Sequence, residues 1–498
     1  MKKRIHDIEL FIKYPHDVQA ELFRKQIDQA KNTEFGKKYD FKSISSYKEY
    51  QKRVPLHSYE QLFPYIERLM RGEQNILWPS EIKWFAKSSG TTNARSKFIP
   101  VSPEALEDCH YKGGKDLISI YINNNPESRM FTGKGLAIGG SHQINEFDQN
   151  AESYYGDVSA VIMKNLPLWA QLIRTPSLDV ALMDKWEEKI EKMAKVTAEE
   201  NVTTLSGVPT WTILLLQRIM EIKKVDNILE VWPNLEAFFH GAVAFTPYRE
   251  LFKKLIPSDK MHYWETYNAS EGFFGIQDQK GSEELLLMLD YGIFYEFIPF
   301  EEIHKEHPKV LSLDEVEIGK NYAMIISTNA GLWRYNIGDT VKFTSVEPYR
   351  IKISGRTKHF INAFGEELII ENAESAITWA CDQTNAIIDN FTAAPIYFDE
   401  GKRGGHEWII EFRKHPESLE RFNELLDKKL REVNSDYDAK RYQDMALLPP
   451  KVHSVAEGTF YKWMEKRGKL GGQNKVPRLS NNREHIDDIL EMLAMQAD

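Results

Sequence analysis

The stretch Lys87-Ser88-Ser89-Gly90-Thr91-Thr92-Asn93-Ala94-Arg95-Ser96-Lys97 decides how the rest of the sequence is interpreted. It joins a run of serine, glycine and threonine residues to a lysine that follows shortly after. Backbone N–H groups and hydroxyls in such a turn can surround a polyphosphate, and a lysine can neutralise it. The stretch lacks the G-x-x-x-x-G-K-[ST] spacing of a Walker loop. Taken alone, it is also compatible with a solvated Ser/Thr turn.

Two motifs further along the chain could complete a nucleotide site. Glu265-Thr266-Tyr267-Asn268-Ala269-Ser270-Glu271-Gly272 offers a ring that can stack on a purine, a hydroxyl for a phosphate oxygen and a carboxylate for Mg²⁺. In Arg334-Tyr335-Asn336-Ile337-Gly338-Asp339, the glycine permits a tight turn and the aspartate can accept hydrogen bonds from two ribose hydroxyls. Each motif alone also fits a purely structural role, as a strand end with a buried tyrosine and as an ordinary turn.

Two glycine-containing segments follow, and each carries a lysine. Gly355-Arg356-Thr357-Lys358 is followed by Gly365, and Gly471-Gly472-Gln473-Asn474-Lys475-Val476-Pro477-Arg478 is a loop that presents Lys475. A lysine next to glycines and proline is ordinarily a solvated loop tip. The order of all five motifs along the chain is more informative than any one of them.

The set resembles the adenylate-forming superfamily, and within it the Gretchen Hagen family of acyl-acid amido synthetases, which is known from plants and bacteria. The resemblance covers nearly the whole chain. It is carried by Ser88–Thr92 running into Lys97-Phe98-Ile99-Pro100, by Tyr267–Gly272, by Lys475–Arg478, by Thr33–Gly36, and by the segment from Val54-Pro55 to Tyr59-Glu60. One departure is Ala94, which stands where the family's phosphate loop usually has a second glycine.

The resemblance implies a role for each matching residue. The residues expected to hold the ATP phosphates are Ser88, Ser89, Gly90, Thr91, Thr92 and Lys97. Those expected around the adenine are Gly241, Ala242, the stacking ring of Tyr267, Asn268 and Ala269. Ser270 would touch the α-phosphate, Glu271 would bind Mg²⁺, and Asp339 and Arg356 would bind the ribose. Lys358 would be the hinge of a mobile C-terminal domain, and Lys475 would reach the reacting carboxylate and α-phosphate during adenylation.

The acyl pocket is harder to locate from the sequence. Val208, Trp211 and Tyr155 fall in segments where the family builds this pocket. Trp211 and Tyr155 are also compatible with positions in the hydrophobic core, so both interpretations stay open for them.

The reaction implied by the resemblance has two steps and uses ATP and Mg²⁺. A carboxylic acid is adenylated with release of pyrophosphate, and an amine, by analogy an amino acid, then takes the acyl group and releases AMP. An acyl-CoA ligase shares the first step but transfers the acyl group to a thiol, which makes it the main alternative. A non-catalytic nucleotide-binding protein is a weaker alternative, because Glu271 and Lys475 are both retained.

Composition and hydrophobic pattern predict an α/β protein with two domains. The 498 residues are 42% hydrophobic and 28% charged, which is ordinary for a globular protein. The first 80 or so residues read as helical segments, and from about Trp84 short apolar strands alternate with helical stretches, with a β-rich region over 285–300 and 321–328. We therefore expect a large N-terminal ATP- and acyl-binding domain (1–355) and a smaller mobile α+β domain (356–498). Within the latter the pattern predicts strands at 359–363, 394–398 and 407–412, and a helix with one apolar face around Phe422.

The charge and the cysteine content limit which partners and which cellular compartment we expect for the protein. A formal net charge of −10 speaks against a broad nucleic-acid-binding surface, which needs clustered lysine and arginine. Two cysteines imply no disulfide framework, the N-terminus does not read as a signal peptide, and no apolar run is long enough to cross a bilayer. We therefore expect a cytoplasmic protein that binds small molecules and neither nucleic acid nor membrane; the sequence does not indicate its oligomeric state.

Overall fold

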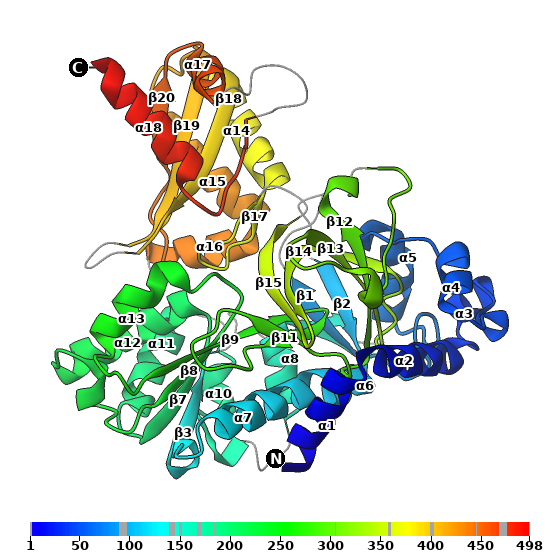
Figure 1. The fold of residues 1–498 in the computed structure, drawn as a ribbon. Helices are drawn as coiled ribbons and strands as arrows, with labels where there is room; N and C mark the ends of the chain where they lie inside the picture. Colours follow the sequence, from blue (N-terminus) through cyan, green and yellow to red (C-terminus); the bar gives the residue numbers. More distant parts are fainter. Residues whose placement is uncertain are drawn as a thin grey trace.

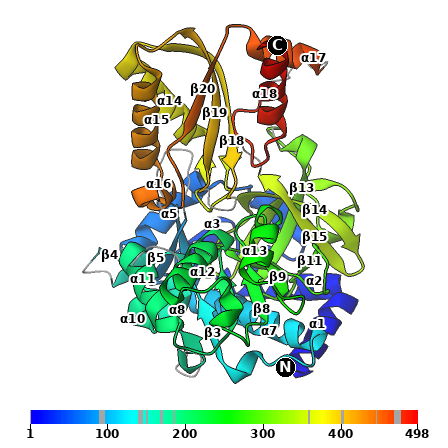
Figure 2. The same cartoon turned by 90° about the vertical axis from the view of Figure 1, so that its left-hand side faces the viewer.

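A computed structural model shows two packed bodies, with the C-terminal part of the chain above a larger N-terminal part (Figures 1 and 2). The residues that the structure describes are 2–88, 97–138, 145–148, 152–166, 171–183, 186–303, 305–356, 360–398, 403–444, 446–467 and 476–497. Within these residues, no helix combines the length and the apolar composition that crossing a membrane requires.

The chain begins with a series of helices. They are α1 (Lys2–Lys13), α2 (Pro15–Ala30), α3 (Glu34–Lys38), α4 (Tyr47–Arg53) and α5 (Tyr59–Met70). The side chain of Thr33 caps α3 and that of Ser46 caps α4, each by accepting a backbone N–H. Leu62, Ile66 and Leu69 share one face of α5 and are fully buried, so this helix is held by the core.

A four-stranded sheet carries the two ends of the predicted phosphate loop. Its order is β2 (Lys97–Val101), β1 (Trp84–Ser88), β5 (Ser153–Gly156) and β4 (Asn145–Asp148). β1 and β2 are antiparallel, and their register pairs Ser88 with Lys97. The pairing brings the first hydroxyl of the loop and its lysine to the same end of the sheet.

An eleven-stranded mixed sheet forms the body of the molecule, in the order β12-β13-β14-β15-β11-β10-β9-β8-β7-β3-β6. Its parallel part is β6 (Arg174–Thr175), β3 (Lys134–Ala137), β7 (Val202–Gly207), β8 (Ala237–His240) and β9 (His262–Ala269). The antiparallel part adds β10 (Gly272–Ile276), β11 (Leu285–Leu287), β15 (Tyr349–Arg356), β14 (Tyr335–Val346), β13 (Asn321–Thr328) and β12 (Ile293–Pro299). All residues of β8 are buried, as expected for a strand covered on both faces.

Further helices lie around the two sheets (Figure 1). They are α6 (Pro103–Ala105), α7 (Lys112–Asn124), α8 (Val158–Lys164), α10 (Leu178–Ala181), α11 (Trp186–Thr197), α12 (Pro209–Lys223) and α13 (Arg249–Leu255). A π-helical turn over Leu106–Tyr111 joins α6 to α7. The mixed α/β architecture of the prediction is confirmed.

The C-terminal part is a three-stranded sheet between helices. It comprises β16 (Phe360–Ile361), β17 (Leu368–Ile369), α14 (Ile370–Thr384), β18 (Ile387–Ile396), β19 (Gly405–Lys414), α15 (Leu419–Val433), α16 (Ser435–Arg441), β20 (Lys451–Val455), α17 (Thr459–Lys466) and α18 (Glu484–Ala497). Trp408 and Ile410 pack toward α15, whereas Ile409 packs with Trp463 of α17 and Ile489 of α18. α14 and α15 thus cover one face of the sheet and α17 and α18 the other (Figure 2).

The strands of this part differ from the predicted bounds. The strand expected over 394–398 is β18, which begins at Ile387, because the antiparallel ladder with β19 continues past the polar pair Asp389-Asn390. The strand expected over 359–363 is only β16, because Asn362–Glu367 form a turn with positive φ at Gly365 and Glu367. The predicted helix around Phe422 is α15, with Phe422, Leu426 and Leu430 buried on one face. The proposed boundary at residue 355 falls at the end of β15 and stays a prediction.

Candidate active site

A cavity of about 1200 Å³ opens between the large sheet and the C-terminal part. Most of the predicted site residues that the structure describes line it: Ser88, Lys97, Val208, Trp211, Gly241, Ala242, Tyr267, Asn268, Ala269, Ser270, Glu271, Asp339 and Arg356. The predicted residues Ser89, Gly90, Thr91, Thr92, Lys358 and Lys475 lie outside the described residues. Residues from strands, loops and a helix far apart in the sequence therefore meet at one hollow, which is large enough for a nucleotide and a small acid.

Asp339 ties together two of the predicted nucleotide ligands. Its carboxylate accepts a hydrogen bond from the Tyr267 hydroxyl at 2.7 Å and another from Arg356 Nε at 2.8 Å. The strand register makes this possible, because β14 and β15 pair Asp339 directly with Arg356. Burial raises the pKa of Tyr267, and the adjacent Asp339 raises it further, so the phenol stays a hydrogen-bond donor.

Arg356 is held from two sides. Besides Asp339, its guanidinium lies 3.6 Å from a carboxylate oxygen of Glu367, which follows the turn after β16. Burial alone would lower the pKa of Arg356, but Glu367 and Asp339 raise it above its ordinary value. The arginine thus stays charged and oriented at the wall of the cavity.

A second chain of contacts links Lys97, the lysine predicted to bind phosphate, to Glu271, the predicted magnesium ligand. Lys97 Nζ donates to the Tyr335 hydroxyl at 3.2 Å, and that hydroxyl donates to Glu271 Oε1 at 3.4 Å. Burial raises the pKa of Glu271, although the nearby Lys97 opposes this shift. A buried carboxylate with a raised pKa gains from a cation placed beside it.

The donor set around Glu271 fits Mg²⁺. Within the described residues there is no group of three or more histidine, cysteine, aspartate or glutamate side chains arranged to hold a metal. Mg²⁺ does not need such a cage, because it is commonly held by one or two carboxylates together with substrate phosphates and water. Glu271 supplies one such carboxylate in the same cavity as Lys97 and Ser88, which are predicted to hold the phosphates.

The turn predicted to face the adenine has a backbone that few residues could adopt. A Cβ on Gly241 would lie 2.6 Å from the Thr266 carbonyl oxygen, so only glycine fits there. Ala242 follows with φ of 69°, in the left-handed region that alanine rarely adopts. Its carbonyl accepts a hydrogen bond from the Asn362 side chain at 3.2 Å, which connects the turn to the segment after β16.

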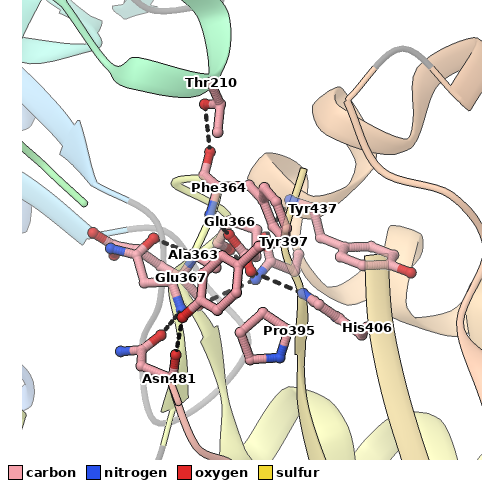
Figure 3. Close-up of polar contacts among 12 residues, drawn as sticks. Thr210, Ala363, Phe364, Glu366, Glu367, Pro395, Tyr397, His406, Tyr437 and Asn481 are labelled. Carbon is pink, nitrogen blue, oxygen red and sulfur yellow. Dashed lines mark hydrogen bonds and ion pairs between the residues drawn. The ribbon is translucent and has the colours of Figure 1, made fainter. Parts of the chain in front are cut away.

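Residues 362–367 form the joint between the two bodies, and we call this segment the joint loop. On the N-terminal side, Thr210 Oγ1 donates to the Phe364 carbonyl at 3.2 Å, and the Tyr248 hydroxyl donates to the Ala363 carbonyl. On the C-terminal side, Glu366 is fully buried and bonds His406 Nε2 at 2.8 Å (Figure 3). The loop is therefore fastened to both bodies by named polar contacts.

Of the three predicted acyl-pocket residues, two line the cavity and one does not. Val208 and Trp211, at the start of α12, line the cavity, and Trp211 is also part of the core beneath it. Tyr155 lies in β5, packs edge-on against Phe98 with ring centroids 5.2 Å apart, and is not among the described residues that line the cavity. A role of Tyr155 in acyl binding stays a prediction.

Several charged residues of this cavity had no role predicted for them from the sequence, namely Glu265, Glu367, Asp436 and Lys440. Glu265 lies two residues before Tyr267 on the same strand, and burial raises its pKa to about 7. That spacing places both side chains on one face of β9, which is a signal the sequence does contain. Lys440 has no comparable signal, since it follows Ala439 in a short charged helix.

Known proteins match the chain along most of its length. Residues 4–261 match the GH3 family N-terminal domain, 286–356 the GH3 family central domain, and 371–484 the GH3 family C-terminal domain. An indole-3-acetic acid-amido synthetase of Arabidopsis thaliana (GH3.3) is 22% identical, with 96% of this chain and 91% of that protein covered. A 4-substituted benzoates-glutamate ligase of the same plant (GH3.12) is 21% identical, with 88% and 86% covered.

The fold agrees with that of a solved relative. The structure of the GH3.15 acyl acid amido synthetase superposes with a TM-score of 0.62 at 16% identity, covering 99% of this chain and 96% of that one. The three family matches together run from residue 4 to residue 484, so they include both bodies of the structure. The resemblance seen in the sequence is confirmed: the chain belongs to the GH3 (Gretchen Hagen) family.

Proposed function

We propose that the protein is an ATP-dependent acyl-acid amido synthetase, which joins a carboxylic acid to an amino acid through an acyl-adenylate. The observation that carries this proposal is the single cavity in which Ser88, Lys97, Glu271, Asp339 and Arg356 meet beside Trp211. Nucleotide ligands and an apolar wall in one hollow suit a reaction between ATP and an organic acid.

In the first step the acid carboxylate attacks the α-phosphate of ATP, and pyrophosphate leaves. Asp339, held by Tyr267 and Arg356, binds the ribose, while Lys97 and Ser88 bind the phosphates. Glu271 would hold Mg²⁺, which offsets the charge of the phosphates when bound. No covalent enzyme intermediate is needed, so these residues act by positioning the reactants and by stabilising charge.

The second step transfers the acyl group to the amine. Lys475 leaves as the C-terminal domain (356–498) turns about Lys358, and the acceptor enters the same cavity. The buried joint loop supports this division, because it is the segment fastened to both bodies. We further propose a cytoplasmic location, small-molecule partners alone, and Mg²⁺ as the metal.

The experiment is a carboxylate-dependent ATP–pyrophosphate exchange screen, followed by mass spectrometry of products formed with pooled amino acids or with CoA. Exchange together with an amide product supports the proposal. A thioester product would instead identify an acyl-CoA ligase, and absence of both exchange and product across a broad panel of acids would overturn the assignment.

Lys475 provides a separate test of the two-step scheme. Its charge would act only on the adenylation transition state, so we expect Lys475→Ala to slow pyrophosphate exchange about 10²–10³-fold. The variant should still convert a supplied synthetic acyl-adenylate and amine at close to the wild-type rate. Equal losses in the two assays would mean that Lys475 serves both steps or is structural.

A further inference from the structure

We propose that Lys440 binds the carboxylate of the acceptor amino acid, and so selects amines that carry a carboxylate. This inference rests on the proposed function and adds a recognition site for its second substrate. Lys440 lies on α16, in the C-terminal part of the chain, and lines the same cavity as the nucleotide ligands. Its side chain is buried, with only 6% of the residue exposed.

In the described part of the chain, the surroundings of Lys440 contain a ring but no anion paired with it. Its ammonium nitrogen lies 5.2 Å from the centroid of the Trp211 ring, on the opposite body. Among the residues that the structure describes, none forms a hydrogen bond or an ion pair with the Lys440 side chain, whose ammonium contacts the Trp211 ring. A buried ammonium gains strongly from an anionic partner, which a ring supplies only in part.

Neighbouring cations in the same region do have such partners. Arg441, the next residue, binds Asp427 through two nitrogens at 2.7 Å, and Arg356 binds Asp339 at 2.8 Å. Lys440 thus differs from these two arginines, because it faces the cavity and no carboxylate of the described residues pairs with it. A ligand that brings a carboxylate would complete its surroundings.

The position of Lys440 favours the acceptor over the other ligands. A Cβ built on Gly365 would lie 3.5 Å from Lys440 Nζ, so the ammonium lies against the joint loop. Two residues further along this loop, Glu367 pairs with Arg356 and so leads to the ribose site. Lys440 therefore lies beside the acyl wall at Trp211, across the joint loop from the nucleotide set.

In the second step, the acceptor amino acid is the substrate that still has a free carboxylate. The carboxylate of the acyl acid is already bonded to AMP. The acceptor nitrogen forms the new C–N bond as the C–O bond to AMP breaks; the electron pair leaves with AMP, and the ammonium proton is released to solvent. Lys440 takes no part in these bond changes and holds the acceptor's carboxylate. A second carboxylate on the acyl acid would present the same group, and the experiment separates the two.

The first test uses the wild-type enzyme. Each standard amino acid is compared with its own α-carboxamide as the acceptor in the amide-forming assay. We expect the carboxamide to have a kcat/KM at least about 10-fold lower, the size of a lost charge-assisted hydrogen bond. Equal use of acids and carboxamides would overturn the inference without any variant.

The second test compares Lys440→Met with a matched control, Lys428→Met. Lys428 lies 5.7 Å from the Trp379 ring in the same body, but it is exposed and does not line the cavity. Lys440→Met should raise the KM for the amino acid about 10-fold or more, with pyrophosphate exchange and carboxamide kinetics within about twofold of wild type. Lys440→Arg, which keeps the charge, should recover part of the preference for the amino acid over its carboxamide. It replaces the methionine variant in the test if that variant does not fold.

The outcomes separate this inference from the proposed function. If Lys440→Met and Lys440→Arg change the kinetics of amino acid and carboxamide by the same factor, Lys440 is a structural contact with Trp211 and the inference is wrong. A higher KM for the acyl acid in pyrophosphate exchange would place the bound carboxylate on that acid and also overturn it. A wild-type enzyme that exchanges pyrophosphate but forms no amide would overturn the proposed function as well.

Discussion

Asp339 shares one carboxylate between Tyr267 and Arg356, which are predicted to lie at the adenine and at the ribose respectively. Tyr267 and Arg356 each donate to it, and neither can turn away without losing that bond. The arrangement fixes all three groups at the cavity wall, which lowers the conformational cost of binding a nucleotide. Their joint placement depends on β9, β14 and β15 keeping their registers.

Replacing Asp339 should therefore affect nucleotide binding beyond the loss of its own contacts. We expect Asp339→Ala to weaken ATP binding at least about 10-fold, since a charge-assisted hydrogen bond contributes ~1.5–3 kcal/mol and two partners lose their orientation. Calorimetric titration of the folded variant measures this. Asp278→Ala is the matched control, because Asp278 also pairs with an arginine, Arg350 at 2.7 Å, but does not line the cavity. Unchanged ATP affinity in Asp339→Ala would contradict the assignment.

Glu265 should make stability depend on pH in a defined direction. Burial raises its pKa to about 7 from 4.5, so between these values the folded chain binds a proton that the unfolded chain releases. The free energy of unfolding should consequently fall as pH rises through this window. In Glu265→Gln this contribution is absent, and the variant should gain on the order of 2–3 kcal/mol relative to wild type between about pH 4.5 and pH 8. Urea unfolding at both pH values measures the difference; a constant difference would contradict the raised pKa.

At the scale of elements, the joint loop is short and conformationally demanding. Gly365 has φ of 82°, and a Cβ there would lie 3.4 Å from Lys440 Cε. The loop also carries the buried pair of Glu366 with His406. Its backbone and its contacts therefore position Lys440 and Arg356 together.

Gly365→Ala tests this coupling. An alanine in the left-handed region costs ~1–2 kcal/mol, so the free energy of unfolding should fall by about that amount. Gly319→Ala is the control, since Gly319 has φ of 85° and nothing within 4 Å of its Cβ position. Both variants should lose similar stability in urea unfolding, but only Gly365→Ala should raise the KM for the acceptor. An equal KM for the acceptor in the two variants would show that the contact between Gly365 and Lys440 does not affect acceptor binding.

The sequence could predict those parts of the site that lie within short motifs. Tyr267–Glu271 and Asp339 stand at fixed spacings beside glycines, and the helix around Phe422 follows from its apolar period. Lys440 and Glu367 could not be found this way, because an amphipathic helix and a turn carry charged residues for solubility as often as for binding. Their roles arise only when α16 and the joint loop pack against α12, which lies far earlier in the chain.

The polar stretch in β18 shows that local sequence also fails to predict some strand bounds. Asp389 and Asn390 suggest a loop when read locally, yet pairing with β19 extends the strand through them. Strand bounds depend on the partner strand, whereas the long amphipathic helices carry their own pattern. This is why α15 was predicted more accurately than β18.

For the whole molecule, the two-step scheme requires the C-terminal body to adopt two orientations. Lys358, expected to be the hinge, lies outside the described residues. Lys358→Pro would fix its φ and favour one orientation, so one half-reaction should stay close to wild type while the other slows. Single-turnover measurements of adenylation and of transfer from supplied acyl-adenylate decide this. Equal slowing of both steps in a stable variant would argue against a hinge at Lys358.

The hydrogen bond from Asn362 to the Ala242 carbonyl has a consequence for product release. One end of this bond belongs to the joint loop and the other to the turn that is predicted to face the adenine. Any rotation that breaks the bond also frees that turn, and by thermodynamic reciprocity a nucleotide that reshapes the turn biases the rotation by an equal free energy. Departure of AMP and reopening of the two bodies would then be linked events, and the spent nucleotide would act as an inhibitor that holds the enzyme in one orientation.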